Sequence, residues 1–313
     1  MSADNENRKP MISVVIPVYR SATILPKTLE RLDAFFAQHE YPHEIIFVND
    51  GSPDDSWRVL RELKANRDDV IAIDLMRNYG QHSAMMCGLQ ESRGDYVITM
   101  DDDLQNPPEE IEHLVNKAEE GDDVVFGRFH QKMHGFVRRI GSRIVNWLNV
   151  KLFKKPATLT LTNFRIIRRE AVDAACEFRT TYPYLPGILL MTGKTFANVD
   201  VEHHARAQGK SNYTGVVIAR LIWRIIFNYS AFPLRLLCGI GLVTALASFL
   251  VGVYFVFRKL SGDTQVPGWT SLIVLLSFYQ GLTLVVLAAL GEYVVRLVND
   301  VSGPRAYRVR QKI

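Results

Sequence analysis

Residues 96–111 read YVITMDDDLQNPPEEI, which places a short β-rich apolar run, a polar turn and a helical segment in immediate succession. The apolar run Tyr96–Met100 ends directly in three aspartates. Pro107 and Pro108 then open a stretch with helical periodicity, because proline is tolerated in the first turn of a helix. A strand that leads through a turn into a helix is the repeating unit of an α/β sheet.

The same unit recurs on both sides of this stretch. Further apolar β-rich runs are found at 12–16, 44–48, 70–75 and 124–126, and segments of helical period lie between them at 24–38, 56–65 and 82–91. Strands that alternate with helices favour a parallel sheet covered on both faces. We therefore predict an α/β, Rossmann-like domain with a mostly parallel sheet.

Polar clusters follow three of the predicted strands. They are Asn49-Asp50-Gly51-Ser52, Arg77-Asn78-Tyr79-Gly80 and Asp101-Asp102-Asp103-Leu104-Gln105. In parallel sheets ligands bind beyond the carboxyl ends of the strands, so the three clusters should converge on one site. No GxGxxG follows the first run and no GxxxxGK[ST] occurs in the chain, which excludes a dinucleotide fingerprint and a P-loop.

The acidic cluster predicts a divalent metal site. In an extended stretch Asp101 and Asp103 point to the same side and Asp102 points away, so the outer pair could share one ion. Carboxylate oxygens select Mg²⁺ or Mn²⁺, which could bridge them to the phosphates of a nucleotide. A solvated acidic turn or a helix cap before Pro107 is the alternative at this stage.

Two long apolar runs predict a membrane hairpin. Leu236–Phe257 is 22 residues without a charge, and a second run extends over 269–291. Each is long enough to cross a bilayer, and two buried helices of a soluble domain are the alternative. Basic residues are more numerous outside the runs than in the loop that joins them, so the positive-inside rule places both long ends in the cytoplasm. The N-terminus lacks a signal peptide's apolar region, which agrees with this orientation.

Composition narrows the classes of partner. The 313 residues are 48% apolar and carry a formal net charge of +4, but no Asp or Glu occurs from His203 to Gly262. Within that stretch 214–230 places Arg220, Arg224 and Asn228 four residues apart among aliphatic side chains. This pattern predicts an amphipathic helix at a membrane surface and argues against nucleic acid, although a helix packed on the domain would look similar. The three cysteines are far apart and predict no disulfide framework.

Four segments together resemble a known family. VVIPVYRSA at 14–22, FVNDGSPDDS at 47–56, LMRNYGQHSAMMCG at 75–88 and MDDDLQNPPEEI at 100–111 are similar to family-2 glycosyltransferases of the GT-A fold. More narrowly, the chain resembles the membrane-anchored polyprenyl-phosphate glycosyltransferases, which include dolichol-phosphate mannose synthase and the bacterial undecaprenyl-phosphate glucose and 4-deoxy-4-formamido-arabinose transferases. The resemblance covers nearly the whole chain.

The resemblance implies roles for particular residues. Nucleotide-sugar binding falls to Pro17, Tyr19, Asp50, Arg77, Gly80 and Asp102. Metal binding, of Mg²⁺ or Mn²⁺, falls to Asp101, Asp103 and Gln105. The lipid phosphate falls to Arg138, Ser142, Arg206 and Ser211, and the catalytic set is Asp101, Asp103, Arg138 and Arg206. Arg138 and Ser142 are four residues apart and would share one helix face.

Three segments depart from the family pattern, at four positions. The second motif has Asn49 before Asp50 where an aspartate is frequent, and Asn212 stands where relatives have a lysine. Asn163 and Leu159 stand where some relatives have acidic residues, which puts a carboxylate base in this region in doubt. A lipid phosphate monoester has a second pKa of roughly 6 and is already nucleophilic at neutral pH, so a base is nearly superfluous.

The resemblance implies a domain plan and a function. The plan is a GT-A catalytic domain at 1–210, an interfacial helix at 211–232, a transmembrane hairpin at 233–295 and a basic tail at 296–313. The implied function is inverting, metal-dependent transfer of a sugar from a nucleotide-sugar, expected to be a UDP-sugar, to undecaprenyl phosphate. The reaction would take place at the cytoplasmic face of the bacterial inner membrane, and the enzyme would be a homotetramer. The product would serve lipid A, O-antigen or other envelope glycosylation. A processive polysaccharide synthase and an inactive membrane scaffold are the alternatives, and the sugar stays open.

Overall fold

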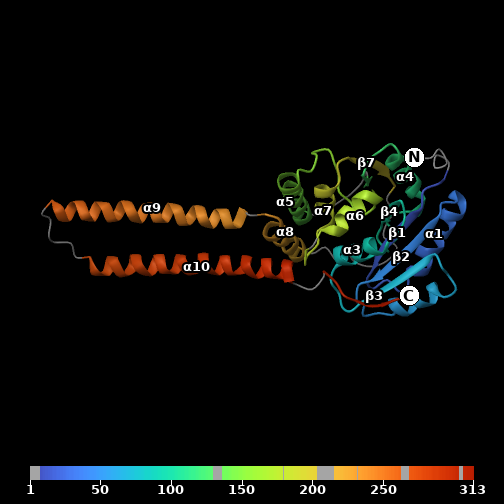
Figure 1. The fold of residues 1–313 in the computed structure, drawn as a ribbon, viewed down its shortest axis with the longest axis horizontal. Helices are drawn as coiled ribbons and strands as arrows, with labels where there is room; N and C mark the ends of the chain where they lie inside the picture. Colours follow the sequence, from blue (N-terminus) through green and yellow to red (C-terminus); the bar gives the residue numbers. More distant parts are fainter. Residues whose placement is uncertain are drawn as a thin grey trace. The chain divides into compact units, whose positions relative to one another are not determined.

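The computed structural model describes residues 8–129, 136–178, 180–202, 215–230, 232–261, 268–302 and 306–313. The chain forms two compact units (Figure 1). The first unit is Met1–Arg220 together with Pro304–Ile313, and the second is Leu221–Gly303. The chain therefore returns to the first unit for its last residues.

One sheet organises the first unit. Its strands, among the residues described, are β1 (Ile12–Val18), β2 (His43–Asn49), β3 (Val70–Leu75), β4 (Tyr96–Thr99), β5 (Val124–Phe129), β6 (Arg165–Arg168), β7 (Phe196–Val201) and β8 (Val309–Lys312). They lie in the order β7-β5-β6-β4-β1-β2-β3-β8. The pairs β1–β2, β1–β4, β2–β3 and β5–β7 are parallel, whereas β6 runs antiparallel to β4 and β5, and β8 runs antiparallel to β3.

Helices connect and cover the strands. They are α1 (Leu25–His39), α2 (Ser56–Lys64), α3 (Gln81–Glu91), the short 3₁₀ helix η2 (Pro108–Glu110), α4 (Ile111–Glu119), α5 (Phe136–Phe153), α6 (Arg169–Glu177) and α7 (Leu185–Thr192). Helix α8 (Gly215–Tyr229) crosses from the first unit into the second. The predicted α/β fold with a mostly parallel centre is confirmed.

Both faces of the central strand are buried. All seven residues of β1 are buried, and those at even positions join one apolar cluster with α1, α2 and α4. Val15 faces the opposite way, toward α3, where a Cβ on Gly88 would lie only 2.2 Å from its Cγ1. Burial on both sides is what a continuous apolar run such as ISVVIPV predicts for a parallel strand.

The order of the strands creates a switch point between β1 and β4. From β1 the chain winds outward through β2 and β3, and then crosses back to form β4 on the other side of β1. At such a point the connections leave in opposite directions and open a crevice at the carboxyl ends of the two strands. Tyr19 directly follows β1, and Asp101 follows β4 after Met100.

The C-terminal residues differ from their description as a basic tail. The segment 296–313 is divided between the end of a long helix, α10, and strand β8, which pairs with β3. All four residues of β8, Val-Arg-Gln-Lys, are exposed. The strand therefore lacks the alternation of apolar and polar residues by which a strand is predicted from sequence. This segment forms a strand because it makes backbone hydrogen bonds with β3 at the edge of the sheet.

The second unit consists mainly of two long helices, α9 (Phe232–Leu260) and α10 (Trp269–Ser302). They run alongside each other (Figure 1), and the Tyr279 hydroxyl donates to the Thr244 carbonyl at 3.4 Å. They contain the predicted runs 236–257 and 269–291. Counted over the described residues alone, no helix combines the length and the apolarity that crossing a membrane requires. The transmembrane hairpin stays a prediction.

Candidate active site

The switch point brings the end of β1 against the acidic turn after β4. The Tyr19 amide donates to Asp102 Oδ2 at 3.4 Å, and the Thr28 hydroxyl of α1 donates to the Asp102 carbonyl at 3.4 Å. The Tyr19 side chain is 36% exposed, whereas Pro17 is buried within β1 opposite Val48. Of these two predicted nucleotide-binding residues, Tyr19 is the one with exposed surface at the crevice.

Two side-chain amides hold the carboxylate of Asp101. Gln81, the first residue of α3, donates to Asp101 Oδ1 at 2.5 Å. Asn163, just before β6, has its amide nitrogen 3.3 Å from both carboxylate oxygens. Because both donors are neutral, these contacts orient Asp101 without cancelling its negative charge.

A buried arginine, Arg165, helps to position Asn163. Arg165 is fully buried, and its Nε donates to the Thr99 hydroxyl at 3.0 Å, which in turn donates to the Asn163 carbonyl at 2.6 Å. Burial lowers the pKa of Arg165 to about 10, while the charge of Asp101 acts in the opposite direction. The chain of contacts fixes the backbone of Asn163 and with it the amide that reaches Asp101.

The turn that follows Asp101 is tight. Leu104 has φ 57° and is buried, although a residue with a Cβ is disfavoured in the left-handed region. The Gln105 amide donates to Asp103 Oδ1 at 3.1 Å, which closes the turn on the carboxylate. Backbone strain of this kind persists where the surroundings enforce it, and it is concentrated at functional sites.

The middle aspartate has an unusual proton affinity. Burial, with the charges of Asp101 and Asp103 acting in the same direction, raises the pKa of Asp102 to about 7, against hydrogen bonds from Ser21 and Tyr19. The charges of Asp101 and Asp103 thus disfavour a third negative charge on this turn. A cation beside this turn would relieve that repulsion.

Asp50 holds the loop that contains Arg77 and Gly80. The carboxylate is 3% exposed, and its two oxygens accept the amides of Tyr79 at 2.7 Å and Gly80 at 2.8 Å. Burial raises the pKa of Asp50, and these two amides oppose the rise. Asp50 was predicted to accept hydrogen bonds from a base or ribose. In the structure both of its carboxylate oxygens also orient the loop that contains Tyr79 and Gly80.

The glycine after Asp50 is required by a close approach. Gly51 has φ +58°, and a Cβ there would lie 2.4 Å from the carbonyl carbon of Arg77. Only glycine allows both this backbone conformation and this approach. Asp50 and Gly51 together place the exposed Arg77 and the turn at Gly80 beside the crevice.

The donor set suits a hard divalent cation. Among the described residues, no group of three or more His, Cys, Asp or Glu side chains is placed to hold a metal ion by itself. Mg²⁺ and Mn²⁺ usually bind through one or two carboxylates and complete their shell with water and substrate phosphates. The carboxylates of Asp101 and Asp103, on a turn where negative charges crowd, fit that mode of binding.

The predicted phosphate-binding residues are only partly described. Arg138 and Ser142 both lie in α5, as their spacing predicts, and Ser142 is exposed. The side chain of Arg138 lies outside the described part of the chain, as do Arg206 and Ser211. Their part in the site stays a prediction.

Sequence reasoning missed two of the contacts on Asp101. Gln81 follows the RNYG cluster, but a glutamine at the start of a helix has no signature that would distinguish it. Asn163 draws attention only as a departure from an acidic residue, and its contact spans 62 positions of sequence. No local pattern predicts a pairing over that distance.

Comparison with known proteins agrees with this fold. The profile of glycosyl transferase family 2 matches residues 13–175, which contain all the contacts described above. The chain is 36% identical over 306 residues to the undecaprenyl-phosphate 4-deoxy-4-formamido-L-arabinose transferase of Proteus mirabilis, covering 96% of this chain and 94% of that one. It is 33% identical over 310 residues to the protein of that name from Aeromonas hydrophila, covering 96% and 93%.

Solved structures share the fold at lower identity. Glucosyl-3-phosphoglycerate synthase from Mycobacterium tuberculosis, in complex with Mn²⁺, UDP and phosphoglyceric acid, aligns with a TM-score of 0.53 at 18% identity, over 70% of this chain and 76% of that one. The same enzyme with Mn²⁺ and UDP-glucose gives a TM-score of 0.53 at 17% identity, over 71% and 79%. This likeness establishes the GT-A fold. By its family profile and by relatives aligned over nearly its full length, the chain belongs to glycosyl transferase family 2 and is a glycosyltransferase.

Proposed function

We propose that this glycosyltransferase moves a sugar from a nucleotide-sugar, most simply a UDP-sugar, to undecaprenyl phosphate at the cytoplasmic face of a bacterial inner membrane. The observation that carries the proposal is the extent of the similarity to the Proteus mirabilis transferase, which covers 96% of this chain. Similarity of that extent includes the long helices as well as the sheet. The product would serve lipid A modification or other envelope glycosylation.

The chemistry of the site supports this transfer. Asp101, Asp103 and Gln105 would hold Mg²⁺ or Mn²⁺, and such an ion would supply Lewis-acid stabilisation of the departing nucleotide diphosphate. Asp101 is oriented for that task by the amides of Gln81 and Asn163. Asp50 fixes the loop at Tyr79 and Gly80 that would border the donor.

The acceptor's own charge makes a protein base unnecessary. A phosphate monoester with a second pKa of roughly 6 is largely dianionic near neutral pH. Its oxygen forms the bond to the anomeric carbon while the bond from that carbon to the nucleotide diphosphate breaks, and the configuration inverts. Asn163 agrees with this scheme, because an amide stands where a carboxylate base would be expected. Arg138, Ser142, Arg206 and Ser211 would bind the acceptor phosphate.

Activity on a lipid acceptor provides the test. We would incubate the purified protein in detergent with undecaprenyl phosphate, Mg²⁺ and a panel of UDP-sugars, and look by mass spectrometry for lipid that has gained one sugar. Asp103→Ala should abolish the product, and Asp68→Ala, an exposed aspartate outside the site, should not. A ladder of longer sugar chains would instead identify a processive synthase. Full activity of Asp103→Ala would contradict the metal assignment.

We further propose that α9 and α10 insert into the membrane as a hairpin. The run 236–257 has no charge, and large apolar side chains on α9 are exposed, among them Leu242 at 73%, Val243 at 67% and Phe249 at 67%. Exposed apolar surface of this extent normally marks contact with lipid or another protein. The catalytic unit and both termini would then be cytoplasmic, and the resemblance adds a homotetramer, which native mass spectrometry can check.

A charge at mid-helix tests the membrane proposal. Leu246→Arg, near the centre of the run, should disfavour insertion by about 2.5–3.5 kcal/mol and shift the protein out of the carbonate-washed membrane fraction. Leu260→Arg, at the end of α9, is the matched control, because an arginine there can extend to the interface. Equal membrane retention of Leu246→Arg and wild type would contradict the hairpin.

A further inference from the structure

The last strand of the chain carries an arginine that contacts the end of β3. From β8, Arg310 Nη1 lies 3.2 Å from Asp74 Oδ2, and its Nη2 donates to the Met76 carbonyl at 2.8 Å. The backbones are joined there too, because the Met76 amide donates to the Arg308 carbonyl at 2.9 Å. The Arg310 side chain therefore contacts both the end of strand β3, at Asp74, and the first residue of the following loop, Met76.

The groups that Arg310 contacts adjoin the loop described above. Asp74 Oδ1 accepts the side-chain amide of Asn49 at 2.7 Å, and Asn49 directly precedes Asp50. Met76 directly precedes Arg77, whose backbone packs on Gly51. The loop 76–80 is thus held at its far end by the Asp50 carboxylate and at its near end by Arg310.

A second set of contacts attaches the same strand to α3. The Tyr307 hydroxyl bonds Gln90, and Lys312 forms an ion pair with Glu91. Helix α3 begins with Gln81, the residue that donates to Asp101. The C-terminal segment 306–313 therefore braces the loop and the helix that follows it.

We propose that Arg310 is a positioning residue for the donor site, acting through the loop 76–80. The inference rests on the proposed function in taking this loop to border a nucleotide-sugar. Pairing with β3 and contacts with α3 hold the segment that contains β8 in place. This segment positions the Arg310 guanidinium, which in turn holds the Met76 carbonyl by a hydrogen bond. The segment 306–313, predicted as part of a basic tail, thereby helps to position the donor site. In sequence, residues 221–303 separate it from the rest of the first unit.

Electrostatics explains why an arginine stands at this position. The Asp74 side chain is 3% exposed, and a buried carboxylate requires a compensating charge. A guanidinium can satisfy that carboxylate and still donate a second hydrogen bond to a carbonyl, whereas an ammonium offers no rigid fork. The two acceptors, Asp74 Oδ2 and the Met76 oxygen, match that fork.

Hydrogen exchange tests the positioning role without any ligand. In the full-length protein, Arg310→Ala should speed exchange of the amides of Tyr79 and Gly80, and Arg308→Ala, which alters an exposed side chain on the same segment, should not. With the nucleotide-sugar that the wild type uses, Arg310→Ala should raise the donor KM about tenfold, as expected for one lost charge-assisted hydrogen bond. The KM for undecaprenyl phosphate should not change, and Arg310→Lys should recover part of the loss.

A double variant separates positioning from stability. Arg310→Met leaves the buried Asp74 without its compensating charge, and adding Asp74→Asn removes the negative charge while keeping an acceptor for Asn49. The double variant should regain the wild-type Tm but keep the fast exchange at Tyr79 and Gly80, because the Met76 carbonyl still lacks its donor. Wild-type exchange in the double variant would overturn the proposal, since Arg310 would then act only by neutralising Asp74. If the wild type glycosylates no lipid, the proposed function fails, but the exchange result still decides the positioning role.

Discussion

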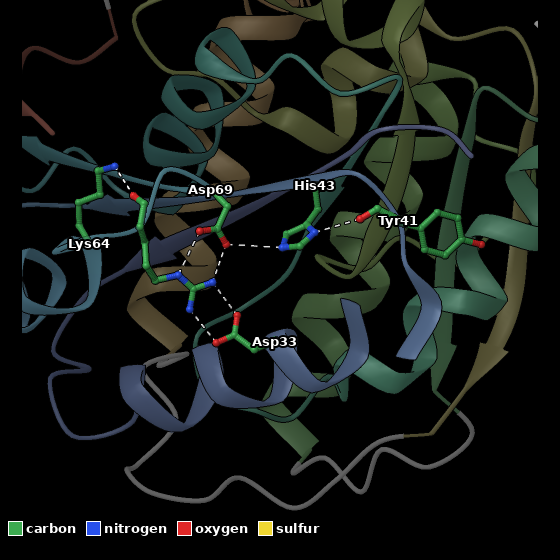
Figure 2. Close-up of polar contacts among 6 residues, drawn as sticks. Asp33, Tyr41, His43, Lys64 and Asp69 are labelled. Atoms are coloured by element: carbon green, nitrogen blue, oxygen red, sulfur yellow. Dashed lines mark hydrogen bonds and ion pairs between the residues drawn. The ribbon is translucent and has the colours of Figure 1, made fainter. Parts of the chain in front are cut away.

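At the amino end of β2 and β3, carboxylates are paired with positive charges (Figure 2). Arg67 donates to both oxygens of Asp33 at 2.7 Å and to Asp69 at 2.5 and 3.1 Å, and His43 Nε2 lies 3.5 Å from Asp69. The hydrogen bonds that Arg67 donates to these two aspartates raise its pKa, and the guanidinium lowers the pKa of Asp69. At this end a guanidinium is shared by two carboxylates and serves stability.

At the carboxyl end of β4, neutral amides donate to the acidic turn. Asp101 accepts from the amides of Gln81 and Asn163, and Asp102 accepts from a backbone amide. Such donors orient a carboxylate and leave its charge available to a cation. The two ends of one sheet therefore show how the same residue type serves stability when paired with a guanidinium and chemistry when held by amides. Four changes test this contrast.

The largest effect should follow from removing charge at the carboxyl end. Asp101→Asn should lower kcat by about 10²- to 10³-fold, because a charge that would stabilise the transition state through the metal is lost. The Tm should change little, because repulsion within the acidic turn decreases while the buried Arg165 loses part of its compensating charge. Enzyme assays and thermal denaturation in detergent would check both. A large drop in Tm would mean that Asp101 serves stability, as Asp33 and Asp69 do.

A smaller effect should follow from removing an amide that orients Asp101. Asn163→Ala should raise the metal concentration needed for half-maximal activity by about 10- to 100-fold, the usual cost of losing a contact to a metal ligand. Metal titration of activity measures this. Asn198→Ala, which removes an amide from a strand away from the acidic turn, is the control. An unchanged metal requirement would remove Asn163 from the site.

The amino end should respond in stability and not in activity. Arg67→Met should cost about 1–2 kcal/mol of unfolding free energy, because two partly buried carboxylates lose their shared partner. Arg58→Met is the matched control, since Arg58 also bridges two carboxylates, Asp55 and Glu62, but on an exposed helix face. Arg58→Met should cost less. A fall in kcat for Arg67→Met at saturating substrates would break the contrast between the two ends.

The smallest effect is a pH dependence at the amino end. The pKa of Asp69 is lowered in the folded protein by the hydrogen bonds from Arg67, so its stabilising contribution is present above the unfolded pKa of about 3.9 and is lost as pH falls through the folded value. The Tm difference between wild type and Asp69→Asn should therefore be present at pH 7 and close below about pH 4. Asp68→Asn should show no such convergence. A constant difference across this range would exclude the ion pair as its cause.

Local patterns predicted the elements and failed on their long-range pairings. The runs at 12–16, 44–48 and 70–75 became β1, β2 and β3 nearly residue for residue, because burial on both faces requires continuous apolar strands. Strands β6, β7 and β8 were not predicted. Strand β8 is short and polar, and it exists only because the edge of β3 offers it hydrogen bonds.

The site divides in the same way. The convergence of Asp50, Gly80 and the acidic turn was expected from their positions at the ends of strands. Asp50 accepts the Gly80 amide, and Gln81, the next residue, donates to Asp101. The partners of Asp101 did not follow, because Gln81 and Asn163 lie 20 and 62 positions away in sequence.

The sequence by itself determined the periodicities, the polar clusters after strands and the family, since these are properties of neighbouring residues and of motifs read in order. The tertiary structure alone decided which neutral groups orient Asp101, that both oxygens of Asp50 hold a loop, and that Arg310 returns across 236 positions to Asp74. Such contacts depend on loop closures and on which sheet edge lies open, and a one-dimensional pattern contains neither.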